Sequence, residues 1–177
     1  MQHRLAILPI AIGLQLMAGC TDSSGPVASV TLPVAAIDQC DSASFNAGIG
    51  AGTCTRNGSM TLAQFNAELT AQHSVAAWTF APTTLTARVG DNIVVTNQGG
   101  EVHTFTEVEA FGGGVVPSLN TASGNPVEAP ECTHLAAEDF IAAGATMTEE
   151  AETSTGTEYY QCCIHPWMRA VVTVRSR

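Results

Sequence analysis

The stretch that most constrains this chain is residues 157–174, TEYYQCCIHPWMRAVVTV. Within it Cys162, His165 and Met168 follow one another at three-residue intervals, and alternating apolar segments flank them on both sides. Such alternation is typical of β-strands, so the sequence predicts two strands joined by a tight turn that carries a thiol, an imidazole and a thioether. A mononuclear copper site uses these groups, with two histidines and a cysteine in a plane and a weak axial methionine.

The second histidine of such a site has to come from elsewhere in the chain. His103, in VVTNQGGEVHTFTEV, is the upstream candidate. A lone histidine in a threonine-rich strand is more often structural than a ligand, so the case for His103 depends on the C-terminal motif. His73, at a predicted helix end, and His134, in a long irregular segment, are weaker candidates.

Composition limits the kind of partner. The chain has 177 residues, enough for one compact domain with extensions, and its formal net charge is −10. Nucleic-acid binding needs a basic surface, so we expect no nucleic-acid partner. The segment from Glu101 to Glu158 contains many acids and no lysine or arginine. It is either a solvated surface or an acidic docking face for a basic redox partner.

The N-terminus predicts export. Residues 1–19 combine a weakly basic start with an apolar run too short to span a bilayer, and small residues precede Cys20. This pattern resembles a bacterial lipoprotein signal, in which Cys20 would carry the lipid; the alternative is an ordinary cleaved signal. Either implies an oxidising compartment outside the cytoplasm. Residues 20–36 predict a tether between membrane and domain, or else a poorly marked first strand at 27–34.

The rest of the chain divides into an extension and a β-rich domain. Residues 37–75 contain Cys40, Cys54 and a short helix over 61–72 that Ser59 or Thr61 could cap. Residues 76–177 show strand-like alternation separated by turns, which predicts six or seven strands in an antiparallel, all-β sandwich. The expected strands are 78–89 (broken at Pro82), 92–97, 101–108, 146–152, 157–163 and 169–175. The stretch 109–145 predicts a long loop with one helical turn near 136–142.

The combination of His103 on a strand, a loop, the C-x-x-H-x-x-M turn and a final strand resembles the cupredoxin family, the small blue copper proteins. The run Cys-Cys-Ile-His-Pro-Trp-Met is most similar to the short ligand loop of amicyanin-type members, and plastocyanin shares the arrangement. The resemblance covers residues 76–177. It implies a Greek-key β-sandwich with one type 1 copper at one end, held by His103, Cys162, His165 and axial Met168.

The resemblance also implies a function and supporting roles. Such a protein carries single electrons, is not an enzyme, and exchanges electrons with a partner such as a cytochrome; we expect a monomer. Thr104 is a candidate to support the thiolate, and Pro166 stiffens the turn. Glycines 112–114 would form an apolar rim around His165 together with Pro166 and Trp167. Copper oxidases of this fold need more domains and more histidines than this chain offers. A copper-buffering or copper-delivery protein is the alternative, using the same ligands.

Six cysteines leave a pairing problem. If Cys162 binds copper and Cys20 is lipidated, four remain, and four cysteines allow three pairings. We expect Cys40–Cys54, which are close in sequence, and Cys132–Cys163 as the remaining pair. The second bridge would pin the long loop behind the metal turn.

Overall fold

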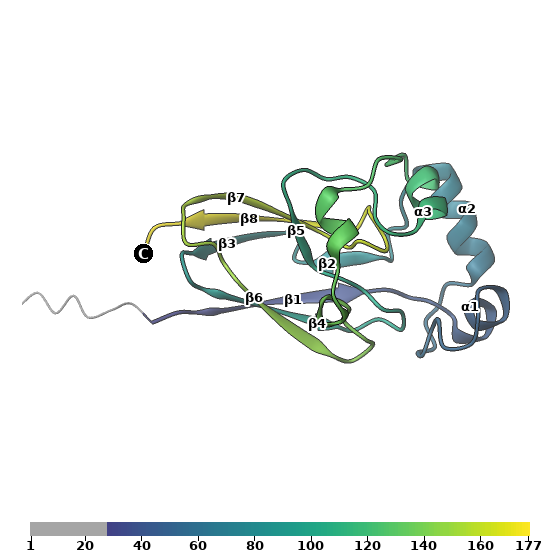
Figure 1. The fold of residues 1–177 in the computed structure, drawn as a ribbon. Coiled ribbons are helices and arrows are strands. Elements are labelled where there is room, and N and C mark those ends of the chain that lie inside the picture. Colours follow the sequence, from purple (N-terminus) through teal and green to yellow (C-terminus); the bar gives the residue numbers. More distant parts are fainter. Residues whose placement is uncertain (1–27) are drawn as a thin grey trace, which may run out of the picture.

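The structure is a computed structural model that describes residues 28–177. The predicted signal peptide and Cys20 lie outside the described residues. Two four-stranded sheets face each other, in the orders β2-β1-β4-β6 and β3-β8-β7-β5, and helices gather at one end of them (Figure 1). Among the described residues, no helix is long and apolar enough to cross a membrane. The elements, in chain order, are β1 (Thr31–Ile37), α1 (Ser42–Gly48), α2 (Leu62–Gln72), β2 (Thr79–Ala81), β3 (Thr84–Arg88), β4 (Asn92–Asn97), β5 (Thr106–Val108), α3 (Pro117–Ala122), η1 (Pro130–His134), η2 (Ala137–Asp139), β6 (Thr146–Glu150), β7 (Gly156–Gln161) and β8 (Arg169–Arg175).

The expected all-β sandwich is confirmed, with a correction to its pairing. Each connection between β2 and β7 crosses from one sheet to the other. The sheets are not purely antiparallel, since β1 runs parallel to β4 and β3 runs parallel to β8. Pairings between strands distant in sequence carry no signal in local alternation, so the sequence could not reveal their direction.

The predicted tether over 20–36 is wrong for its C-terminal part. Residues Thr31–Ile37 form β1, a central strand that pairs with both β4 and β2. Val34 and Ala36 point into the core and are 2% and 0% exposed. The alternative of a first strand at 27–34 was nearer the observed structure. The sandwich therefore begins at residue 31 rather than 76, and the residues between β1 and β2 form a long insertion at one end of it.

The core contains alternating side chains of the two inner faces and a group of stacked aromatic rings. Phe105 stacks on Tyr160 with ring centroids 4.4 Å apart, and Phe80 meets Phe105 edge-on at 5.0 Å. Ile93 and Val95 of β4 are fully buried between the sheets. Burying such side chains contributes on the order of 1.5–3 kcal/mol each, which makes the sandwich a rigid frame for whatever lies at its end.

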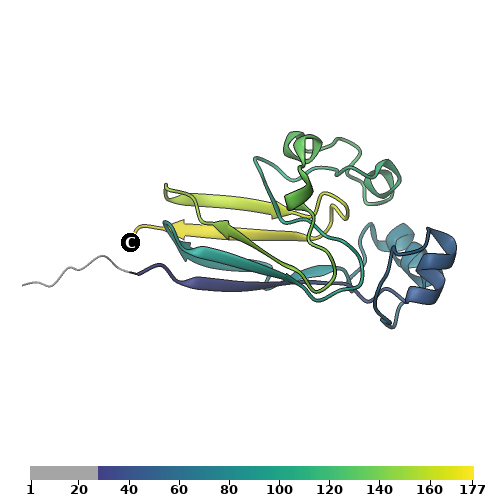
Figure 2. The ribbon, with the colours of Figure 1, turned by 60° about the horizontal axis from the view of Figure 1, so that its bottom comes forward.

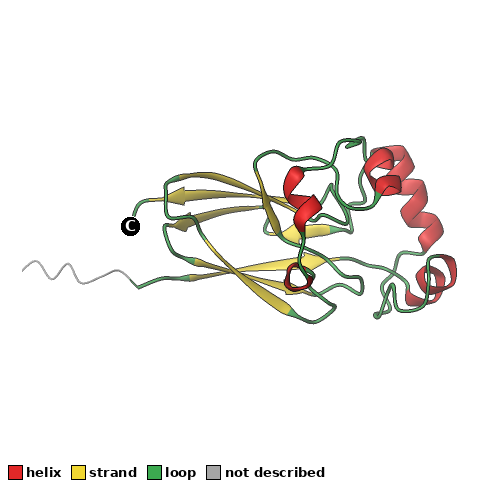
Figure 3. Ribbon diagram, viewed as in Figure 1, coloured by secondary structure: helices red, strands yellow, loops and turns green. Residues whose placement is uncertain are grey.

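The insertion between β1 and β2 forms a helical cap at one end of the sandwich, here defined as residues 38–75 (Figure 3). The predicted helix is confirmed as α2, with Thr61 as its N-cap in a reciprocal capping box. Local periodicity did not predict α1, which is only seven residues long and buries a single side chain, Phe45. Phe45 and Phe65 pack against Trp78 and join the two helices to the core.

Both expected disulfides are present, Cys40–Cys54 and Cys132–Cys163. Their sequence separations are 14 and 31 residues. In the chain-entropy model, closing loops of this size stabilises the fold by roughly 3 and 4 kcal/mol. The first bridge closes the cap, and the second joins η1 of the long loop to the residue after Cys162.

Candidate metal centre

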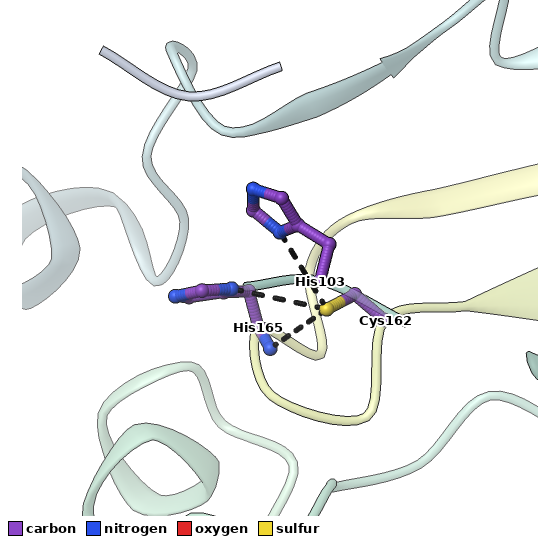
Figure 4. A group of neighbouring side chains, drawn as sticks. All are labelled: His103, Cys162 and His165. Carbon is purple, nitrogen blue, oxygen red and sulfur yellow. Dashed lines mark hydrogen bonds between the residues drawn. The ribbon is translucent and has the colours of Figure 1, made fainter. Parts of the chain in front are cut away.

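The chain places its candidate ligands at the end of the sandwich that the helical cap covers (Figure 2). Cys162 and His165 come from the turn between β7 and β8, while His103 comes from the segment that leads into β5. All three are buried, and one potential ligand atom of each lies within 4.8 Å of the others. Figure 4 shows the two imidazoles and the sulfur converging from these separate segments.

The spacing of these atoms fits a single metal ion. Nδ1 of His103 and Nδ1 of His165 each lie 3.8 Å from Sγ of Cys162. Metal–sulfur and metal–nitrogen bonds of roughly 2.3 and 2.0 Å, set 120° apart, would separate sulfur from nitrogen by about 3.7 Å. One ion at the centre of this triangle could therefore bind all three atoms with little rearrangement.

The turn itself is closed by its own backbone. Cys162 N donates to the carbonyl of Met168 at 3.0 Å, and Met168 N donates to the carbonyl of His165 at 2.9 Å. These bonds give the C-x-x-H-x-x-M run its compact shape. Met168, the fourth predicted ligand, is 1% exposed and belongs to the main hydrophobic core.

Two backbone N–H groups point at the cysteine sulfur. Thr104 N lies 3.4 Å and His165 N 3.5 Å from Sγ of Cys162. The predicted support of the thiolate by Thr104 therefore comes from its backbone. Its hydroxyl instead accepts a hydrogen bond from Cys163 N at 2.8 Å. This contact fixes the segment that carries His103 against the segment that carries Cys162.

The sulfur lies in surroundings that favour its ionised form. Burial alone raises the pKa of Cys162, but hydrogen bonds and charge interactions with His103 and His165 lower it well below its usual range. Burial lowers the pKa of both histidines, while their contacts with Cys162 and with carboxylates raise it overall. A thiolate is the form that binds a metal, so the two histidines favour the form of Cys162 that a metal site needs.

A buried carboxylate holds the far side of His103. Oδ2 of Asp38 lies 2.9 Å from Nε2 of the imidazole, and both side chains are fully buried. Burial raises the pKa of Asp38, but the contact with His103 and three backbone N–H donors lower it to about 2. An imidazole that donates Nε2–H to a carboxylate keeps Nδ1 free for a metal.

A second carboxylate lies behind His165. Oε2 of Glu101 is 3.4 Å from Nε2 of His165 and accepts a 2.7 Å hydrogen bond from Nε1 of Trp78. Sequence analysis missed both Asp38 and Glu101. A polar residue directly after a strand, and an acid two residues before a candidate ligand, were the only available signals.

Glycines let two backbone segments approach the site closely. Gly99 passes directly over the Asp38 carboxylate, and Gly100 N donates to its Oδ1 at 3.0 Å. Gly114 packs against the Cys163 carbonyl, which accepts a 2.6 Å hydrogen bond from Val115 N. A methyl group on Gly99 would collide with Asp38, and one on Gly114 would collide with Cys163.

The expected apolar rim around His165 is present only in part. Trp167 lies beside it, with ring centroids 5.5 Å apart in an edge-on arrangement. Glycines 112–114 belong to the long loop and instead approach other residues of that loop and Cys163. His165 is 3% exposed and lines a hollow of about 430 Å³ between the cap, α3 and the metal turn.

Two sheets with crossing connections, and a His-Cys-His group at one end beside the last two strands, match the arrangement that the sequence resemblance implied. The two-sheet sandwich with its candidate metal site at one end is the arrangement expected of a cupredoxin-like fold. Two features are added to the eight strands of the sandwich: the helical cap, and the long loop pinned by Cys132–Cys163.

Comparisons with known proteins give likenesses in structure alone. No family model matches the chain, and no similarity to a curated protein was found. A purple cupredoxin from Nitrosopumilus maritimus is 15% identical, with a TM-score of 0.45 over 81% of this chain and 99% of that one. A mutant amicyanin in its Cu(I) form is 19% identical, with a TM-score of 0.39 over 58% of this chain and 78% of that one. A mutant fern plastocyanin is 17% identical, with a TM-score of 0.38 over 55% of this chain and 89% of that one. At these values the functional case comes from the side-chain geometry of the site.

Proposed function

We propose that this protein is a single-electron carrier with one type 1 copper ion. His103, Cys162 and His165 would be the three strong ligands, and Met168 the weak axial one. The observation that carries the proposal is the triangle of two Nδ1 atoms, each 3.8 Å from the buried sulfur of Cys162. When bound, copper supplies the one-electron couple.

The surroundings of the ligands suit electron transfer. Cu(I) and Cu(II) prefer different geometries, so a site that rearranges slows the electron. Here each ligand is held by hydrogen bonds and by a packed sandwich, and all are 3% exposed or less. A rigid, dry site keeps one compromise geometry in both oxidation states.

The proposal extends to location and partners. The N-terminal sequence favours a protein outside the cytoplasm, anchored through lipid on Cys20, and working as a monomer. Its partner would be a redox protein such as a cytochrome, with a basic docking surface. In support, several glutamates line an open hollow of about 450 Å³ on the sheet that contains β5 and β7, and they would attract positive charge: Glu107, Glu109, Glu131, Glu152 and Glu158.

The test is electron exchange by the copper-loaded protein. We expect reversible one-electron voltammetry and rapid reduction by a basic cytochrome c, slowed by added salt because charges steer the encounter. The Cys162→Ser variant is the control and should show no such couple. A copper-loaded protein that exchanges electrons only on the scale of hours would contradict the carrier role.

One observation favours the alternative of copper buffering or delivery. The edge of His165 is covered by Glu101 and the helical cap instead of facing solvent. A delivery protein would pass copper to a competing chelator or apo-protein within minutes, while a carrier would retain it. The same copper-loaded sample distinguishes the two functions. A delivery protein would lose its copper, and a carrier would exchange electrons and keep it.

A further inference from the structure

Glu101 is a buried carboxylate that contacts one of the candidate metal ligands. It is 7% exposed, and its Oε2 contacts Nε2 of His165 at 3.4 Å and Nε1 of Trp78 at 2.7 Å. A buried carboxylate is costly unless it is paired and hydrogen-bonded. The contact with Trp78 therefore holds the Glu101 carboxylate in place, and the contact with His165 pairs it with the imidazole.

The backbone of Glu101 is fixed as firmly as its side chain. Its N–H donates to Oδ2 of Asp38 at 3.0 Å, and its carbonyl accepts a 2.7 Å hydrogen bond from the buried Asn97 amide. Asp38 is also the group behind His103. One short connection thus links the carboxylates that contact the two histidines, and the position of each depends on the other.

We propose that Glu101 is a positioning residue that fixes the ring and tautomer of His165 and makes the site favour Cu(II) over Cu(I). The inference rests on the proposed copper site and deepens it, because it names a residue that sets the reduction potential. A carboxylate that accepts Nε2–H keeps Nδ1 unprotonated and makes the imidazole a stronger donor. A stronger donor and an added negative charge stabilise the doubly charged ion more than the singly charged one.

The variant Glu101→Gln tests this with little change in shape. Glutamine keeps an oxygen that can accept from Trp78 but loses the charge that favours Cu(II). We expect the Kd for Cu(II) to rise about 10- to 100-fold. The Kd for Cu(I) should change far less, so the reduction potential should rise by about 60 mV for each tenfold difference.

The chain offers a matched control in Asp91→Asn. Asp91 is likewise a buried carboxylate, 4% exposed, and it accepts hydrogen bonds from Val30 N at 3.0 Å and Arg88 N at 2.9 Å. It contacts none of the candidate ligands. We expect its variant to keep the copper affinities and the potential of the wild type, whatever it does to stability.

Nitrogen-15 NMR of the Cu(I)-loaded wild type gives a readout that needs no variant. The proposal predicts a proton on Nε2 of His165 that exchanges slowly with solvent and is shifted downfield by a carboxylate. A proton on Nδ1, or a freely exchanging Nε2 proton, would overturn it even if Glu101→Gln failed to fold. So would a folded Glu101→Gln protein with unchanged Cu(II) affinity and potential. Wild-type protein that bound no copper would instead overturn the proposed function itself, and this inference with it.

Discussion

Met168 supplies the only thioether of the metal turn and is 1% exposed. Its backbone closes the turn through hydrogen bonds with Cys162 and His165, so its side chain necessarily starts beside the other ligands. A buried methionine often serves only to fill a core. An axial ligand and a core filler respond differently to a change that conserves volume.

We predict that Met168→Leu retains copper but changes its visible and EPR spectra and raises its reduction potential. Leucine fills nearly the same space, so the fold should lose less than about 1.5 kcal/mol. Without the thioether, Cu(II) loses a donor that Cu(I) needs less. Met147→Leu, on half-buried β6, is the control and should leave the spectra as they are. Identical spectra for wild type and Met168→Leu would assign Met168 to the core alone.

The ligand residues could be predicted because three of them lie within seven positions of one another. Local spacing sufficed for Cys162, His165 and Met168, and only one histidine upstream fitted the pattern. The carboxylates behind the histidines could not be predicted. Asp38 meets His103 across 65 positions of sequence, and nothing local marks an aspartate as buried.

Among the elements, the tight connection between β3 and β4 depends on one side chain. Asp91 accepts hydrogen bonds from Val30 N at 3.0 Å and Arg88 N at 2.9 Å, and it pairs with Arg177 at 3.4 Å. It thereby ties the start of β1 and the C-terminal end to this turn. The backbone hydrogen bonds from Val30 and Arg88, followed by the nearby arginine charges, lower the pKa of Asp91.

The lowered pKa of Asp91 determines how its contribution to the stability of the fold changes with pH. The folded state binds the proton of Asp91 less readily than the unfolded chain, so the carboxylate stabilises the fold above about pH 4 and loses this effect as pH falls through its folded pKa. We expect Asp91→Asn to lower the melting temperature by several degrees at pH 7. The difference from wild type should shrink below pH 4, as followed by circular dichroism. A difference that stays constant from pH 7 to pH 3 would contradict this account.

The elements that the sequence predicted well have strong local signals. β4 occupies 92–97 as expected, and α2 begins after Thr61, one of its two candidate caps. The strand expected over 101–108 is shorter, since only Thr106–Val108 pairs as β5 and His103 makes an isolated bridge with Ile141. The preceding residues leave the ladder because their backbone and side chains hold Asp38 and Cys162 instead. β1 was predicted only as an alternative to a tether, because its small residues and Pro33 resemble a linker.

At the scale of the whole molecule, the helical cap changes how this sandwich presents its metal end. The cap supplies Asp38, buries the aromatic cluster around Trp78, and covers the edge of His165. Local periodicity predicted the sandwich but not the cap's position, because that position depends on contacts between residues far apart in the chain. α3 of the long loop lies beside α2 of the cap at this end of the sandwich (Figure 1), and both line the hollow next to His165.

The central claim is that His103, Cys162 and His165 bind one copper ion together. Its most direct test is a Cu(II) titration of the metal-free protein followed by visible absorption, with Cys162→Ser alongside. We predict a strong thiolate-to-copper band that saturates at one equivalent and is absent from the serine variant. A titration that reaches one equivalent with no such band, or a band that survives in Cys162→Ser, would contradict the account.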